Sequence, residues 1–102
     1  MIALRVTESY VGLFLKSKYD DGSRIAAIAR IGTFEVRLVE MPPVNASESL
    51  WVELYNRDLQ VGIDSCKCSD LDEAIDAAQL MLAQARRLNN EAGEAACAVA
   101  GA

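Results

Sequence analysis

The sequence predicts an α+β fold, in which an antiparallel β-sheet of about four to five strands, joined as hairpins or a meander, packs one face against one long C-terminal α-helix. Residues 50–65 alternate apolar and polar side chains, which is typical of half-buried strands. Residues 70–88 space apolar side chains three and four apart, which is typical of a helix with one buried face. We expect one domain over residues 1–88, followed by an Ala- and Gly-rich tail over residues 89–102 that either frays or is disordered.

The first thirty residues are compatible with two structures. The alternation of residues 2–6 predicts a short strand. Residues 10–18 fit a strand or a helix, but Gly12 disfavours the helix, and residues 19–23 are rich in turn formers. We therefore expect residues 10–18 to form a hairpin with residues 24–31, although the alanines of that second segment also suit a helix.

A clearer strand is predicted over residues 33–41, where apolar residues alternate with charged ones. Pro42 and Pro43 should end it, because proline cannot donate a hydrogen bond to the sheet. Residues 44–49 are then expected to form a connecting loop.

Residues 50–56 and 59–65 are predicted to form a hairpin whose turn is centred on Arg57 and Asp58, with either a two-residue loop or a four-residue loop over residues 56–59. One face would be apolar and would bring Leu54 opposite Val61 and Val52 opposite Ile63. A slip by one residue would expose this apolar set, so burial should fix the register. The other face would hold the cross-strand pairs Trp51–Asp64, Glu53–Gly62 and Tyr55–Gln60.

The C-terminal helix is expected to begin near residue 70, because Asp70 and Glu73 form a capping-box pattern. Acidic residues at its start and Arg86 and Arg87 near its end suit the helix dipole. Asn89-Asn90 and then Gly93 mark the predicted stop. The predicted buried stripe consists of Leu71, Ile75, Ala78, Leu82 and Ala85, flanked by Ala74, Met81 and Leu88.

Two surfaces are candidates for binding. Aromatic residues and arginine are enriched at interfaces, and the outer hairpin face with its neighbours offers Trp51, Tyr55, Arg37, Arg57 and Asp64. The alternative is that a second layer covers the two aromatic residues as core. On the helix, the exposed side opposite the buried stripe is a candidate oligomer interface formed by Leu80, Ala77 and Ala83.

Catalytic and metal-binding patterns are poor. The chain has no histidine and no phosphate loop, dinucleotide fingerprint or nucleophile elbow, so we predict a non-enzymatic protein without catalytic residues, metal or cofactor. Cys66 and Cys68 could share a soft metal ion, but a structural zinc site needs four ligands and the only other thiol is Cys97. We therefore interpret Cys66 and Cys68 as small residues at the end of a strand.

Charge and composition indicate which partners and which cell compartment to expect. The net charge is −5, and residues 41–102 hold ten acidic and four basic side chains, which disfavours nucleic acid as a partner. Three cysteines without a disulfide framework indicate a reducing compartment. Because the start lacks a signal-peptide pattern and no apolar run could span a membrane, we expect a bacterial cytoplasmic protein.

These observations favour a small binding module that acts as a homodimer through the outer sheet face. One alternative is an acidic inhibitor or adaptor that presents its Asp64–Asp76 surface to a basic protein in place of nucleic acid. Another is a small-ligand protein, or a simple enzyme, with a pocket between the sheet and the helix.

Overall fold

The computed structural model describes the backbone of residues 2–17, 22–44 and 47–100 and the side chains of residues 2–17, 22–41 and 50–91. Within these ranges the strands pair in the order β1-β2-β3-β4 as an antiparallel meander. The predicted α+β fold, with an antiparallel sheet and a long C-terminal helix on it, is confirmed. The elements are α1 (Ile2–Leu13), β1 (Arg24–Ile31), β2 (Phe34–Val44), β3 (Ser47–Asn56), β4 (Val61–Cys68) and α2 (Leu71–Ala100).

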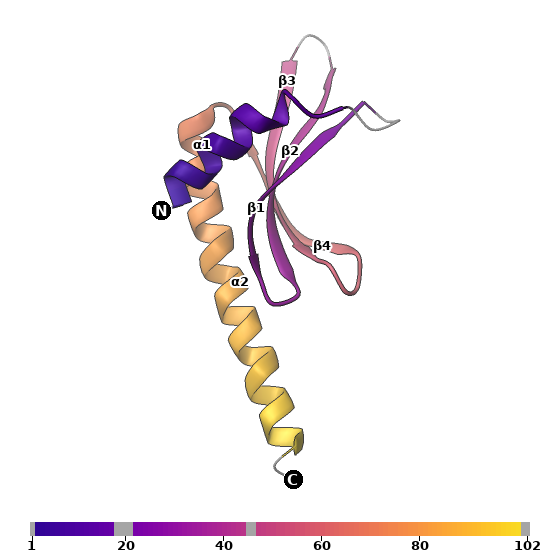
Figure 1. Cartoon of the computed structure of the whole chain (residues 1–102), viewed down its shortest axis with the longest axis vertical. Coiled ribbons are helices and arrows are strands. Elements are labelled where there is room, and N and C mark those ends of the chain that lie inside the picture. Colours follow the sequence, from indigo (N-terminus) through magenta and orange to yellow (C-terminus); the bar gives the residue numbers. More distant parts are fainter. Residues whose placement is uncertain (1, 18–21, 45–46, 101–102) are drawn as a thin grey trace.

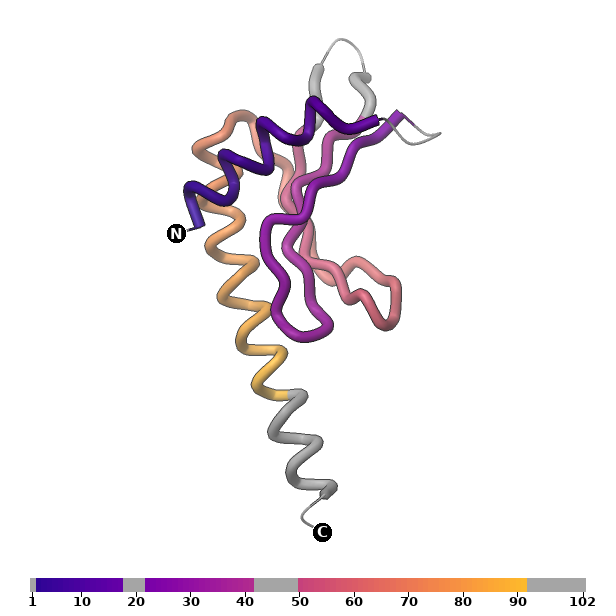
Figure 2. Tube along the Cα trace, viewed as in Figure 1, coloured from indigo at the N-terminus to yellow at the C-terminus, as the bar shows by residue number. Residues whose placement is uncertain are grey.

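Both helices lie on the same side of the sheet, and α1 crosses the first turns of α2 (Figure 1). The Cα trace shows the same two-layer arrangement, with α1 lying against β1 and the turn of the β3–β4 hairpin pointing away from both helices (Figure 2). We call the helix-covered side of the sheet the inner face and the opposite side the outer face.

The core lies between the inner face and the helices. The central strands contribute Val36, Leu38, Val52 and Leu54, all essentially inaccessible to solvent. Leu38 pairs with Val52 and Val36 with Leu54, so these four side chains form one continuous apolar layer. This is the face that the alternation of β2 and β3 predicts.

The N-terminal segment is a helix, so the strand predicted over residues 2–6 and the hairpin strand over residues 10–18 are wrong. Val6 and Leu13 explain the difference: they lie two helical turns apart, and both are fully buried. The cost of about 1 kcal/mol for Gly12 in a helix is smaller than the gain from burying two large aliphatic side chains. The antiparallel partner of β1 is therefore β2.

Strand β2 also continues through Pro42 and Pro43, where we expected it to end. The pairing with β3 is irregular between Met41 and Val44. Prolines are tolerated in sheets at such irregularities, where a backbone N–H is not needed by the neighbouring strand.

The register predicted for the β3–β4 hairpin is wrong. Leu54 lies opposite Asp64 and Val52 opposite Cys66, and a bulge falls at Ile63. The turn spans residues 57–60, because the Asn56 side chain accepts hydrogen bonds from two turn amides at 3.0 Å each. This longer turn leaves Leu59, Val61 and Ile63 exposed, contrary to our prediction.

Helix α2 begins with a variant of the predicted capping box, in which the second hydrogen bond goes to the residue before Asp70. Asp70 accepts a hydrogen bond from the Glu73 amide, and the Glu73 carboxylate accepts one from the Ser69 amide, both at 2.8 Å. The helix continues past the predicted stop to Ala100, in a stretch rich in alanine, the best helix former. The separation of residues 89–102 as a tail stays a prediction.

The buried face of α2 is rotated by about 60° from the predicted stripe, at 3.6 residues per turn. Ala78 and Ala85 are buried as expected, whereas Leu82 is half-buried at the border of this face. The rotation brings small residues against the sheet, which lets the helix approach it closely. The buried side chains of α2 are Ala74, Ala77, Ala78, Met81 and Ala85.

Candidate functional site

The outer face carries a layer of polar and aromatic side chains from the two central strands. The register sets Glu35 opposite Tyr55, Arg37 opposite Glu53, and Val39 opposite Trp51. Side chains alternate between faces along a strand, so all six lie opposite the core layer. The described helices pack on the other side of the sheet.

Glu35 is the centre of an ion-pair network on this face. Its carboxylate accepts hydrogen bonds from Arg30 at 2.6 Å and from Arg37 at 2.9 Å. Arg57 lies 4.0 Å from the same carboxylate, and Arg37 reaches Glu53 at 3.5 Å. Although it lies on the outer face, Glu35 is only 5% exposed.

This environment changes the acidity of Glu35. Burial by itself raises the pKa of the carboxyl group, but hydrogen bonds and positive charges from Arg37 and Arg30 outweigh it, so the pKa lies below its usual value of 4.5. The carboxylate is therefore ionised at neutral pH and fixes the surrounding arginines.

Tyr55 joins the network through its ring. The guanidinium carbon of Arg37 lies 3.7 Å from the Tyr55 ring centroid, which is a close cation–π contact. Arg37 therefore binds Glu35, Glu53 and Tyr55 at once. The Arg37 guanidinium and the Tyr55 ring are therefore held in fixed positions on the outer face.

The other half of the outer face is apolar. Val39, Met41 and Trp51 lie side by side and, together with Glu53 and Ser65, line a shallow hollow of about 210 Å³. Met41 is 40% exposed, and Val39 and Trp51 are half-buried. The outer face thus combines an apolar half with a charged half.

The structure brings together four of the five predicted binding residues, Trp51, Tyr55, Arg37 and Arg57. Asp64 does not join them, because it lies opposite Leu54 and so on the inner side of the exposed strand β4. Glu35 and Arg30 also belong to this group, although the sequence alone does not identify them. Their signal was the alternation of charged with apolar residues on β2, which indicates an outward direction but not the partners.

Of the predicted helix surface, Leu80 is 73% exposed and Ala83 is exposed, whereas Ala77 is buried in the core. Placing Ala77 on this surface was therefore wrong, and the rotation of α2 is the reason. Leu80 and Ala83 remain on the side of the helix that faces away from the sheet.

Cys66 and Cys68 lie in different environments. Cys66 is exposed on β4, and Cys68 is buried at the end of that strand. Burial raises the pKa of the Cys68 thiol to about 11, with further contributions from Cys66 and Glu73. The side chain of Cys97 lies outside the described residues.

We predict that iodoacetamide at pH 8 alkylates Cys66 at least about tenfold faster than Cys68, because thiolate is the reactive form. Trypsin cleaves after Lys67, Arg86 and Arg87, so the three cysteines fall in separate peptides and mass spectrometry measures each rate. In urea the difference should disappear. Equal rates in the folded protein would contradict the burial of Cys68.

The described residues offer little for other chemistry. They contain no cluster of three or more acidic or cysteine side chains arranged to hold a metal ion. None of the described helices is long and apolar enough to cross a membrane. No protein family, curated protein or solved structure matches this chain.

Proposed function

We propose that this protein is a non-enzymatic binding module that acts as a homodimer through the outer face of its sheet. The observation that carries the proposal is that both helices lie on the inner face, while the outer face holds aromatic, apolar and arginine side chains in fixed positions. Aromatic residues and arginine are the types that interfaces favour.

The composition of the outer face supports a second copy of the chain as the partner. A twofold interface brings the same patch of both subunits together, so the patch must be complementary to itself. The apolar half around Met41 and Trp51 can pack against its own copy. The charged half contains both signs, with Glu35 and Glu53 beside Arg37, and so does not repel an identical surface.

The test is the molar mass of the chain in solution, measured by light scattering during size-exclusion chromatography. We expect the wild type to have twice the chain mass of 11.1 kDa. Met41→Arg should shift it toward the monomer by at least about tenfold in the dissociation constant, because an unpaired charge would be buried at the interface. Met41 is exposed within one chain, so the substitution leaves the core unchanged.

Leu80→Lys is the matched control, because it places a positive charge on an exposed apolar residue of the helix layer. It should leave the dimer intact. A wild type that is monomeric at about 100 µM protein would contradict the proposal, because this concentration is well above the dissociation constants of stable dimers. Dissociation by Leu80→Lys but not by Met41→Arg would place the interface on α2 instead.

A further inference from the structure

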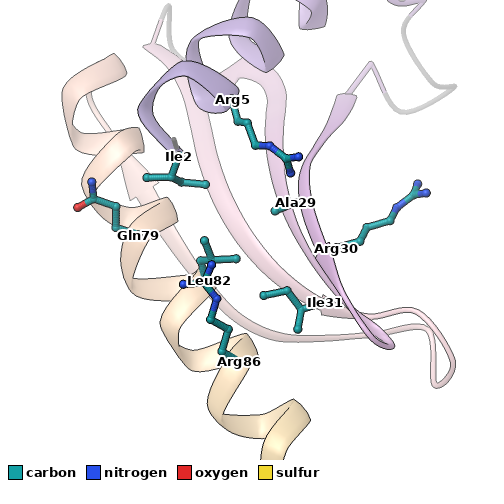
Figure 3. Close-up of a pocket in the computed structure, with 8 residues that line it drawn as sticks. All are labelled: Ile2, Arg5, Ala29, Arg30, Ile31, Gln79, Leu82 and Arg86. Carbon is teal, nitrogen blue, oxygen red and sulfur yellow. The ribbon is translucent and has the colours of Figure 1, made fainter.

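A groove lies on the inner side of the molecule, where α1, β1 and α2 meet (Figure 3). Its volume is about 590 Å³, within the range of about 300–1,000 Å³ typical of small-molecule sites. The lining residues are Ile2 and Arg5 from α1, Ala29, Arg30 and Ile31 from β1, and Gln79, Leu82 and Arg86 from α2.

The floor of the groove is apolar. Ile2, Ile31 and Leu82 are partly buried and pack against the core, and Ala29 is buried beside them. Figure 3 shows these side chains between the two helices and the edge of the sheet. This floor can cover the hydrocarbon part of a ligand and remove it from water.

The charge of the groove contrasts with that of the chain. The protein has 15 acidic and 10 basic residues, yet the lining contains three arginines and no carboxylate. Arg30 is neutralised by Glu35 and points away from the groove in Figure 3. The positive charge of the groove therefore comes from Arg5 and Arg86, which extend into it from α1 and α2.

Arg5 and Arg86 differ from the other arginines of the chain in their ion pairing. The chain has seven arginines, and five of them, Arg24, Arg30, Arg37, Arg57 and Arg87, form ion pairs with described carboxylates. Within the described residues Arg5 and Arg86 form none, and both line the same groove. Guanidinium groups bind carboxylate and phosphate through paired hydrogen bonds.

We propose that this groove binds an anionic amphiphile, a carboxylate or phosphate on a short alkyl or acyl chain. Arg5 and Arg86 hold the anionic group between them, and the chain lies on Ile2, Ile31 and Leu82. The ligand could be a free acid or ester, or part of a lipid, since both present the same chemistry. The site goes beyond the proposed dimer, because it lies on the opposite side of the sheet from Trp51 and Met41.

The probe is octyl phosphate, added to the ¹⁵N-labelled full chain and followed by amide chemical shifts. We expect saturable shifts at residues 2–5, 29–31 and 79–86. Octyltrimethylammonium, which has the same chain and the opposite charge, should bind at least about tenfold more weakly, as should inorganic phosphate. Each CH₂ added to the alkyl phosphate, from butyl to octyl, should tighten binding about threefold to fourfold.

Arg86→Gln and Arg5→Gln should each weaken octyl phosphate binding by about tenfold or more, as expected for the loss of a charge-assisted hydrogen bond. Arg87→Gln is the matched control, since Arg87 is the next residue of α2 and pairs with Glu91 instead. Arg87→Gln should change the affinity for octyl phosphate less than twofold, because an exposed ion pair such as Arg87–Glu91 contributes little. All three arginines are exposed, so the variants should fold like the wild type.

The result is separable from the dimer. Met41→Arg should retain octyl phosphate binding whatever its molar mass. The proposal would be overturned by equal binding of the cationic amphiphile, by equal losses in Arg86→Gln and Arg87→Gln, or by no shifts up to millimolar octyl phosphate. Binding to vesicles containing phosphatidylglycerol without binding to octyl phosphate would also overturn it, because a membrane surface would then be the partner.

Discussion

Leu38→Ala is expected to lower the free energy of unfolding by about 2–5 kcal/mol, the range for large-to-small substitutions in well-packed cores. Leu38 is 0% exposed and lies on a central strand between Ala26 and Val52. Its small neighbour on β1 cannot fill the space that the leucine leaves, so the cavity should persist. Urea unfolding followed by circular dichroism measures the change.

The matched control is Leu80→Ala, the same substitution at an exposed leucine. Its expected effect is within about 0.5 kcal/mol, as for surface positions in general. Both variants should be compared with the wild type at one protein concentration, because a dimer makes apparent stability concentration-dependent. Similar losses in the two variants would mean that the core does not lie between the helices and the inner face.

The central strands could be predicted because their neighbours on both sides impose one pattern. Val36 and Leu38 on β2 and Val52 and Leu54 on β3 all face the core. Each side chain of a central strand lies either on the inner face or on the outer face, and the alternation of apolar residues indicates which. The face of each central strand therefore follows from the sequence.

Strand β4 shows where this inference fails. Val61 and Ile63 alternate as core residues do, yet they are 47% and 39% exposed. β4 lies at the edge of the sheet, so burial does not fix its register as it does for a central strand. The Asn56 side chain and a residue with positive φ, Gln60, set the turn instead.

The N-terminal helix could not be predicted because its amphipathic pattern is weak. Leu4 and Val11 are exposed apolar residues, and they obscure the spacing of Val6 and Leu13. That spacing acquires meaning only when β1 and α2 supply a surface to bury it. Tertiary packing then outweighs local preference.

The candidate site was predictable in its direction but not in its partners. Alternation alone predicts that Trp51 and Tyr55 lie on the outer face, with Arg37 as a neighbour. The central position of Glu35 depends on Arg30 from β1 and Arg57 from the β3–β4 turn, which approach it only in the folded sheet. Those two contacts required a register that the sequence did not determine.

Glu35→Gln is expected to lower the free energy of unfolding at pH 7 by about 1–3 kcal/mol, the range for hydrogen bonds to charged groups. The substitution keeps the shape of the side chain but leaves Arg30, Arg37 and Arg57 close together without their shared negative charge. Glu53→Gln is the control, since its side chain is more exposed and accepts one 3.5 Å contact. Its effect should be smaller, within about 1 kcal/mol.

The pH dependence of this stability difference tests whether the charge of Glu35 is its cause. The pKa of Glu35 is lowered in the folded chain, so ionised Glu35 adds stability that is fully present above its usual pKa of 4.5 and lost as the pH falls through the folded pKa. The difference between wild type and Glu35→Gln should therefore be largest at neutral pH and shrink below pH 4.5. Taking that difference cancels the titration of the other carboxyl groups, which the two proteins share. A difference in the free energy of unfolding that persists unchanged in acid would mean that Glu35→Gln destabilises the fold through altered packing. The negative charge of Glu35 would then not be the cause.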